Sequence, residues 1–127
     1  MSVRTLYEYA VVRVIPRVER EEFVNVGVAL YCKKFRYAEF LFHLDEQKLK
    51  ALYADIDVEE IRKHLESFQQ ICGGNKSFGK IANLDQAECF RWLTANRSTI
   101  IQSSPVHSGL CLSAEETHEE LMNKLVL

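Results

Sequence analysis

Three segments rich in β-branched and aromatic residues crowd the start of the chain, and this crowding most constrains the fold. They span residues 6–15, 23–32 and 37–44, and their composition is typical of β-strands. The first segment ends at Pro16, which cannot donate to a strand ladder. Only the polar residues 33–36 separate the second segment from the third, so these two should form an antiparallel hairpin. Strand and helix patterns do not alternate, which argues against a doubly wound parallel sheet.

The alternation of apolar residues predicts the register of that hairpin. On both strands the apolar residues share the even positions, so pairing Leu30 with Phe40 and Val28 with Phe42 brings the two sets to one face. A shift of one residue would turn one whole set to the other side. The opposite face is then mixed and partly polar, and alternation in the first strand adds Arg13 to it. We expect the helices to cover the apolar face alone.

Helical patterns begin only after residue 44. The expected helices span residues 46–53 after Asp45, 58–72 after Asp57, 85–95, and a final stretch after Ser113. Asp57 followed by Glu60 has the form of a capping box, as has Ser113 three residues before a glutamate. A short β-prone piece lies within residues 97–103. The order of elements predicts one α+β domain over residues 1–127, in which a largely antiparallel sheet of three to five strands is covered by three to four helices.

Composition and charge narrow the function classes. The chain has 127 residues and a formal net charge of −2, which is too short for a (β/α)₈ barrel of about 250 residues. The near-neutral balance makes nucleic acid an unfavoured partner, because a nucleic-acid binder usually carries a basic excess. The charge is uneven: residues 1–44 hold seven Lys and Arg against five Asp and Glu, and residues 45–127 hold nine against thirteen.

The sequence carries no targeting or cofactor signal. No hydrophobic run approaches the ~20 residues of a membrane helix, and the first residues lack the regions of a signal peptide, so we expect a cytoplasmic protein with no membrane partner. The four cysteines form no CxxC pair, which disfavours a zinc or redox site. We expect buried free thiols, no metal and no cofactor.

Established catalytic motifs are also missing. The sequence contains no GxxxxGK[ST], GxGxxG, HExxH or GxSxG pattern, so we name no catalytic residue. His64 and His118 fall on amphipathic helices, where a surface position is expected. His43 and His107 lie beside polar-faced or irregular β structure and are binding candidates.

The predicted strands contain polar residues that a generic core does not need. Asn25 and Gly27 interrupt the second strand, where both residue types are depleted. A bulge or a close backbone approach explains such a glycine, and room for a ligand is the alternative. Arg13 lies mid-strand among tyrosines, while Arg17 and Glu21 belong to a mixed-charge turn.

The richest polar segment lies within residues 96–109. Its candidates are Arg97, Ser98, Thr99, Ser104 and His107. An arginine with hydroxyls and a histidine can hold an anion such as phosphate, but the same composition also satisfies turns and helix caps. Ser104 or Ser108 with His107 as its base is a weaker idea, because near neighbours in sequence rarely have the geometry of a catalytic triad.

Two blocks of the sequence carry a family resemblance. The first comprises Tyr7-x-Tyr9, Val12-Arg13, Pro16-Arg17 and Arg20-Glu21-Glu22-Phe23-x-Asn25-Val26-Gly27-Val28; the second comprises Trp92-Leu93-Thr94-Ala95, Arg97-Ser98-Thr99-Ile100-Ile101-Gln102 and Ser104-Pro105-Val106-His107-x-Gly109-Leu110. They resemble the bacterial domain of unknown function 3037 family over nearly the whole chain. The resemblance implies no established activity. Members of that family are often encoded beside a HipA-like kinase, which implies a partner role.

The two blocks lead to a hypothesis about a site. We expect them to meet on the polar face of the sheet, with Arg97 and His107 within about 10 Å, or two strand spacings, of Arg13 and Asn25. The binding candidates are Arg13, Arg17, Glu21, Asn25, Gly27, His43, Arg97, Ser98, Thr99, Ser104 and His107.

Two functions follow from different classes. The first is a small cytosolic non-catalytic interaction module that partners a HipA-like kinase, indicated by a flat apolar patch or an open sheet edge. The alternative is a phosphate- or nucleotide-binding protein, or an enzyme, with a small anionic ligand in a concave Arg/His/Ser pocket. Binding of single-stranded nucleic acid on a tyrosine and arginine face lacks the expected basic field.

Overall fold

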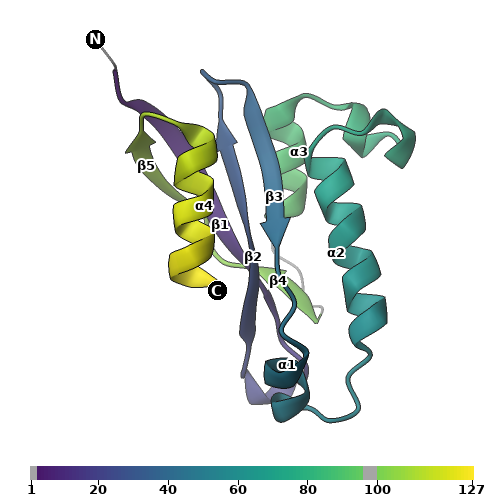
Figure 1. Cartoon of the computed structure of the whole chain (residues 1–127). Coiled ribbons are helices and arrows are strands. Elements are labelled where there is room, and N and C mark those ends of the chain that lie inside the picture. Colours follow the sequence, from purple (N-terminus) through teal and green to yellow (C-terminus); the bar gives the residue numbers. More distant parts are fainter. Residues whose placement is uncertain (1–2, 96–99) are drawn as a thin grey trace.

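A computed structural model describes residues 3–95 and 100–127. The strands are β1 (Thr5–Val14), β2 (Val24–Cys32), β3 (Tyr37–Phe42), β4 (Ile101–Ser103) and β5 (His107–Cys111). The helices are α1 (Glu46–Leu52), α2 (Val58–Cys72), α3 (Gln86–Leu93) and α4 (Ala114–Leu125). The described chain is therefore an α+β fold with an antiparallel sheet, as predicted (Figure 1). The first three strands lie within two residues of their predicted bounds, and β5 was not predicted.

The sheet is organised around β1. Its order is β3-β2-β1-β4, and β5 pairs with β1 on the same edge as β4. The start of β1 pairs with β5 and its end with β4, and Ser104 fills the position between them. The Ser104 amide donates to the Val11 carbonyl at 2.7 Å, and the Ser104 hydroxyl oxygen accepts from the Val11 amide at 2.9 Å. Ser104 therefore allows β4 and β5 to pair with β1 one after the other along the same edge.

The predicted hairpin register is wrong by one residue. Phe40 pairs with Ala29, not with Leu30. The cause is a β-bulge: Val12 pairs with Gly27 but Arg13 with Asn25, which leaves one extra residue in β2. The bulge reverses the alternation of β2, so its apolar residues do not share one face as the sequence pattern indicated.

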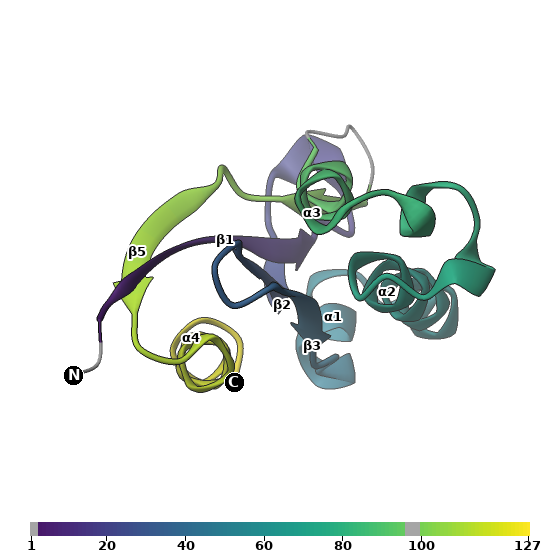
Figure 2. The same ribbon diagram turned by 90° about the horizontal axis from the view of Figure 1, so that it is seen from above.

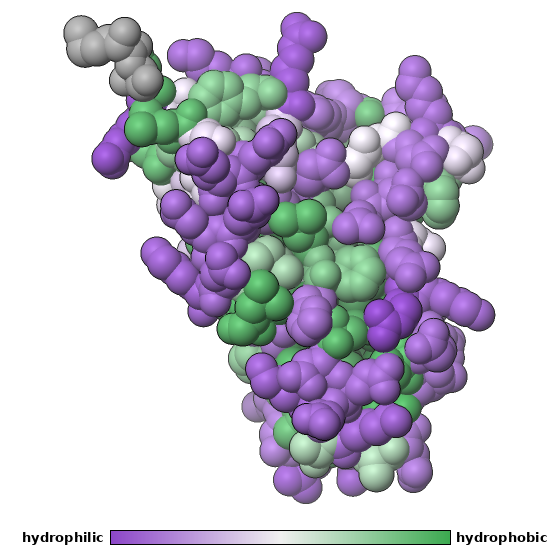
Figure 3. Space-filling model, in the orientation of Figure 1, coloured by the Kyte–Doolittle hydropathy of each residue, from purple (hydrophilic) through white to green (hydrophobic). Residues whose placement is uncertain are grey.

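Helices cover both faces of the sheet, so the prediction that they cover one face is wrong. On one face Phe40 packs with Leu65 of α2 and Phe90 of α3. On the other face Val28 packs with Met122 of α4. Seen from above, α4 lies across the sheet from α3 (Figure 2). On the side toward the viewer in Figure 1, hydrophobic side chains lie over β3 between the hydrophilic surfaces of α4 and α2 (Figure 3).

Side-chain caps fix where the helices begin. Asp45, Asp57, Asp85 and Ser113 each accept a hydrogen bond from the backbone amide three residues further on. These bonds satisfy amides that the helix itself leaves without partners. Three of the four caps were predicted from the sequence alone.

The described residues bear on two further predictions. All four cysteines are free and buried, as expected. Across residues 3–95 and 100–127, the helices are too short or too polar for any of them to cross a membrane.

Candidate functional site

The structure does not bring His107 to Arg13. His107 pairs with Tyr9, and its ring centroid lies 5.4 Å from that of the tyrosine. Arg13 lies four residues further along β1, or about 13 Å at the rise of a strand. Arg97, Ser98 and Thr99 lie outside the described residues. His107 therefore lies apart from Arg13, and the expected single polar site does not form among the described residues.

Arg13 and Asn25 do lie together, opposite each other across β1 and β2. The Asn25 amide donates to the Leu125 carbonyl at 3.1 Å, at the end of α4. The Arg13 guanidinium carbon lies 4.5 Å from the centroid of the Phe23 ring. The Arg13 Nε is buried without a hydrogen-bond partner in the described part of the chain. The hydrogen bond from Asn25 to Leu125 attaches the last turn of α4 to the sheet.

Gly27 is explained by close packing. A Cβ built on Gly27 would lie 2.5 Å from the Leu41 carbonyl oxygen and 2.5 Å from Cε1 of Phe40. The Phe40 ring fills the space that a side chain would need, so Gly27 offers no room for a ligand. The bulge and the close approach were the structural explanations expected for this position.

The remaining predicted candidates sit at the surface or in the backbone ladder. Arg17 is exposed and pairs with Glu19, with Nε 2.9 Å from the carboxylate oxygen. Glu21 is exposed and closes a short turn at φ 58°. His43 is exposed and lines a small cavity of about 200 Å³ beside the end of α4, together with Asn25. Ser104 has the structural role described above.

His118 was expected at the surface, and this prediction is wrong, because the side chain is 0% exposed. Its Nε2 lies 2.6 Å from the Val28 carbonyl oxygen, and its Nδ1 lies 2.7 Å from the Tyr37 hydroxyl. A carbonyl can only accept, so Nε2 carries the proton and Nδ1 accepts from Tyr37. Burial lowers the pKa of His118. The missed signal was the i, i+4, i+8 spacing with Ala114 and Met122, which are the other buried residues of α4.

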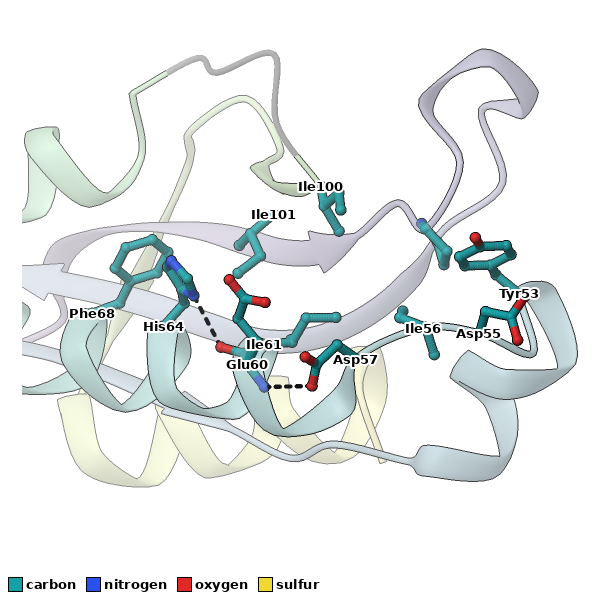
Figure 4. A pocket seen from close by; sticks show the side chains of 11 residues that line it. Tyr53, Asp55, Ile56, Asp57, Glu60, Ile61, His64, Phe68, Ile100 and Ile101 are labelled. Carbon is teal, nitrogen blue, oxygen red and sulfur yellow. Dashed lines mark hydrogen bonds between the residues drawn. The ribbon is translucent and has the colours of Figure 1, made fainter.

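A large concave feature is an apolar groove, and none of the predicted binding residues that the structure describes lines it. Its volume is about 670 Å³, within the range of ligand-binding clefts. Its lining comprises Pro16, Tyr53, Asp55, Ile56, Asp57, Glu60, Ile61, His64, Phe68, Ile100 and Ile101. These residues come from the segment after β1, the connection between α1 and α2, helix α2 itself and the start of β4, and Figure 4 shows them around the groove. We call this feature the α2 groove.

The floor of the α2 groove is hydrophobic. Ile61 is 6% exposed and belongs to the main core, against which Ile56, Phe68 and Ile101 also pack. Tyr53 is 38% exposed and Ile100 is 44% exposed at its margins. The groove therefore presents an apolar surface that is continuous with the core yet open to solvent.

The rim of the α2 groove is acidic. Asp55, Asp57 and Glu60 contribute carboxylates, and Asp57 uses one oxygen to accept from the Glu60 amide at 3.1 Å (Figure 4). In the part of the chain that the structure describes, the carboxylates of Asp55 and Glu60 form no ion pair with Lys, Arg or His. Arg17 lies 6.0 Å from the Tyr53 ring but is paired with Glu19. This rim disfavours the small anion that the sequence suggested.

His64 also lines the α2 groove, as an exposed residue. Its Nδ1 lies 2.9 Å from the Glu60 carbonyl oxygen, so Nδ1 donates to that carbonyl. The helical surface position predicted for His64 is confirmed. Within residues 3–95 and 100–127, no three His, Cys, Asp or Glu side chains are grouped so that they could hold a metal ion.

These features define an α+β protein whose sheet is covered by helices on both faces and which carries an apolar groove with an acidic rim. A family model described as a protein of unknown function (DUF3037) matches residues 9–126. The chain belongs to this family, and the resemblance seen in its two sequence blocks is confirmed. No curated protein and no solved structure matches the chain.

Proposed function

We propose that this protein is an interaction module that binds a segment of a partner protein in the α2 groove. The observation that carries the proposal is a cleft of about 670 Å³ with an isoleucine and phenylalanine floor and a carboxylate rim. Such a surface fits a segment with an apolar anchor residue next to a lysine or arginine.

The two parts of the groove have different roles in this proposal. Burying one leucine or phenylalanine anchor contributes about 1.5–3 kcal/mol from the hydrophobic effect. The rim carboxylates add less affinity, because exposed charges are screened, but they select for a basic partner and orient it. Asp55 and Glu60 suit this role because their carboxylates have no ion pair inside the described chain.

A HipA-like kinase is the first partner to test, because the family resemblance implies a neighbouring gene of that kind. We propose the cytoplasm as the compartment in which the two meet. The anion-binding alternative has less support. Of its candidates, Arg17 is paired with Glu19, and His107 lies about 13 Å along β1 from Arg13.

A display library of random peptides tests the binding mode, since it does not require the partner to be known. The selected peptides should combine an apolar residue with a neighbouring lysine or arginine. Glu60→Lys should abolish their binding, because it reverses the charge at the rim (Figure 4). Glu59→Lys is the matched control: Glu59 also lies in the first turn of α2, but its side chain is 72% exposed and contacts Arg62.

The outcomes separate the two functions. Selection of acidic or phosphorylated peptides, or equal loss of binding in both lysine variants, would contradict a binding site in the α2 groove. Calorimetric titration of the kinase with the same two variants then asks whether it is the partner. A thermal shift with inorganic phosphate that survives Glu60→Lys would favour the anion-binding alternative.

A further inference from the structure

The outer edge of β5 has no strand partner in the described part of the chain. β5 pairs only with β1, and Figure 1 shows it at the margin of the sheet. Natural proteins protect such edges with charged residues, prolines or bulges. Residues 106–114 contain neither Asp, Glu, Lys or Arg nor proline, so this edge lacks the usual protection.

The direction of the backbone groups on β5 follows from β1. The amide and the carbonyl of Val11 both bond to Ser104, so odd-numbered residues of β1 direct their backbone groups toward β4 and β5. The pairs Tyr7 with Gly109 and Tyr9 with His107 are therefore the hydrogen-bonded ones. Ser108 and Leu110 alternate with these odd-numbered residues along β5, so their amides and carbonyls point away from β1.

Exposed apolar side chains lie beside this open edge. Leu6 and Leu110 pair across β1 and β5 and are 60% and 61% exposed. Leu112 is 55% exposed and Val106 is 38% exposed. Val106 and Leu112 lie one residue beyond the two ends of β5, and continued strand alternation would place them on the same face as Leu110. Together these residues form an apolar strip that runs along the unpaired edge.

We propose that two copies of this chain pair antiparallel through β5, about a two-fold axis at Gly109. This register places Ser108 opposite Leu110 of the second copy, so the outward backbone groups of each copy meet those of the other. It also places Val106 opposite Leu112 of the second copy and extends the apolar strip across the axis.

Two observations favour a second copy as the occupant. In a two-fold interface each residue near the axis lies close to its own equivalent, so a charged side chain there would repel its copy, and residues 106–114 contain no Asp, Glu, Lys or Arg. The residue on the axis would form a narrow pair with Cα atoms about 4.5 Å apart. Glycine occupies that position, and the Tyr7 hydroxyl already lies 2.7 Å from where a Gly109 Cβ would be.

The dimer would leave the α2 groove accessible. The groove contains Pro16, ten residues along the chain from Leu6, or about 30 Å at the rise of a strand. Each dimer would then present two grooves and could bind a two-site partner more tightly than one copy can. A strand pair with one apolar strip is a small interface, so we expect dimerisation to depend on concentration.

Sedimentation equilibrium of the full chain from micromolar to millimolar concentration tests the proposal. The wild type should change from monomer to dimer, and Leu110→Lys should remain monomeric at every concentration while keeping its circular dichroism spectrum. Leu84→Lys is the matched control, because Leu84 is 47% exposed but precedes α3, away from β5; it should dimerise like the wild type. A monomeric wild type at millimolar concentration, or equal dissociation by both variants, would overturn the proposal.

Disulfide crosslinking tests the register. Val106→Cys and Leu112→Cys place exposed thiols on residues that face each other across the axis, about 5.5 Å apart between Cα atoms. Under a mild oxidant, a mixture of the two variants should form a crosslinked dimer, whereas either variant alone should not. Crosslinking that is equally strong in a single variant would refute this register.

Discussion

Acidification should weaken the attachment of α4 to the sheet through His118. Nε2 donates to the Val28 carbonyl, and Nδ1 accepts from the Tyr37 hydroxyl. The second bond requires the neutral ring, because a protonated Nδ1 can no longer accept. Protonation would add a charge to a side chain that is 0% exposed, with no water to stabilise it. Burial also raises the pKa of Tyr37, which keeps its hydroxyl protonated and able to donate.

The size of the effect follows from proton linkage. The folded-state pKa of His118 is lowered from 6.5, so below that value the unfolded chain binds a proton that the folded chain does not. Stability is therefore complete above the unfolded pKa and falls as the pH drops toward the folded pKa. The loss reaches at most about 1.4 kcal/mol per pH unit. Between about pH 7.5 and pH 5.5 the loss is at most about 1.4 kcal/mol, which corresponds to a fall in Tm of at most about 4 °C.

Urea unfolding at a series of pH values provides the assay, with His118→Gln as the test variant and His64→Gln as the control. The exposed His64 should leave the pH dependence of the wild type intact, whereas His118→Gln should flatten it. Burial raises the pKa of Glu39, which has the opposite sign, but this contribution cancels when variants are compared. A wild-type stability that stays constant between pH 7.5 and 5.5, or an equal slope in His118→Gln, would refute the reasoning.

Three further predictions concern the sheet and can be measured by urea unfolding. Gly27→Ala should destabilise the protein by about 1–3 kcal/mol, because its Cβ would clash with the Phe40 ring; a change below measurement error would show that the approach is not tight. Ser104→Ala should cost about 1–3 kcal/mol, because it leaves the buried Val11 amide without its acceptor, and a neutral result would mean that water replaces the hydroxyl. Asn25→Ala should cost about 1 kcal/mol and increase hydrogen exchange in the last turn of α4, which its amide holds; unchanged exchange there would contradict that role.

Sequence patterns predicted the local structure well because the groups involved are neighbours in the chain. The Asp57 carboxylate reaches the Glu60 amide within one turn, so the start of α2 is fixed by residues three apart. Prediction failed for features that depend on residues far apart in the sequence. Nothing near Phe40 shows that it pairs with Ala29 and not with Leu30, because the bulge that shifts β2 is defined by its pairing with β1.

The candidate site was predicted less well than the fold. The sequence predicts one site formed by the polar residues of the two family blocks. In the structure, Ser104 accepts a hydrogen bond from the backbone of β1, and Asn25 donates one to the end of α4. The α2 groove was missed because its isoleucines look like ordinary core residues in the sequence. The pattern Asp55-Ile56-Asp57, an apolar residue between two carboxylates, was the available hint.

The sequence by itself determined the class, the strands and helices and most helix starts, since caps and periodicity depend on residues within a few positions of one another. Only the tertiary structure decided that α4 covers the second face, that His118 is buried beneath it, and that Pro16, α2 and Ile101 enclose a groove. These features depend on contacts between segments up to about a hundred residues apart, such as Asn25 with Leu125. Their energies depend on how the elements pack together, so no local pattern encodes them.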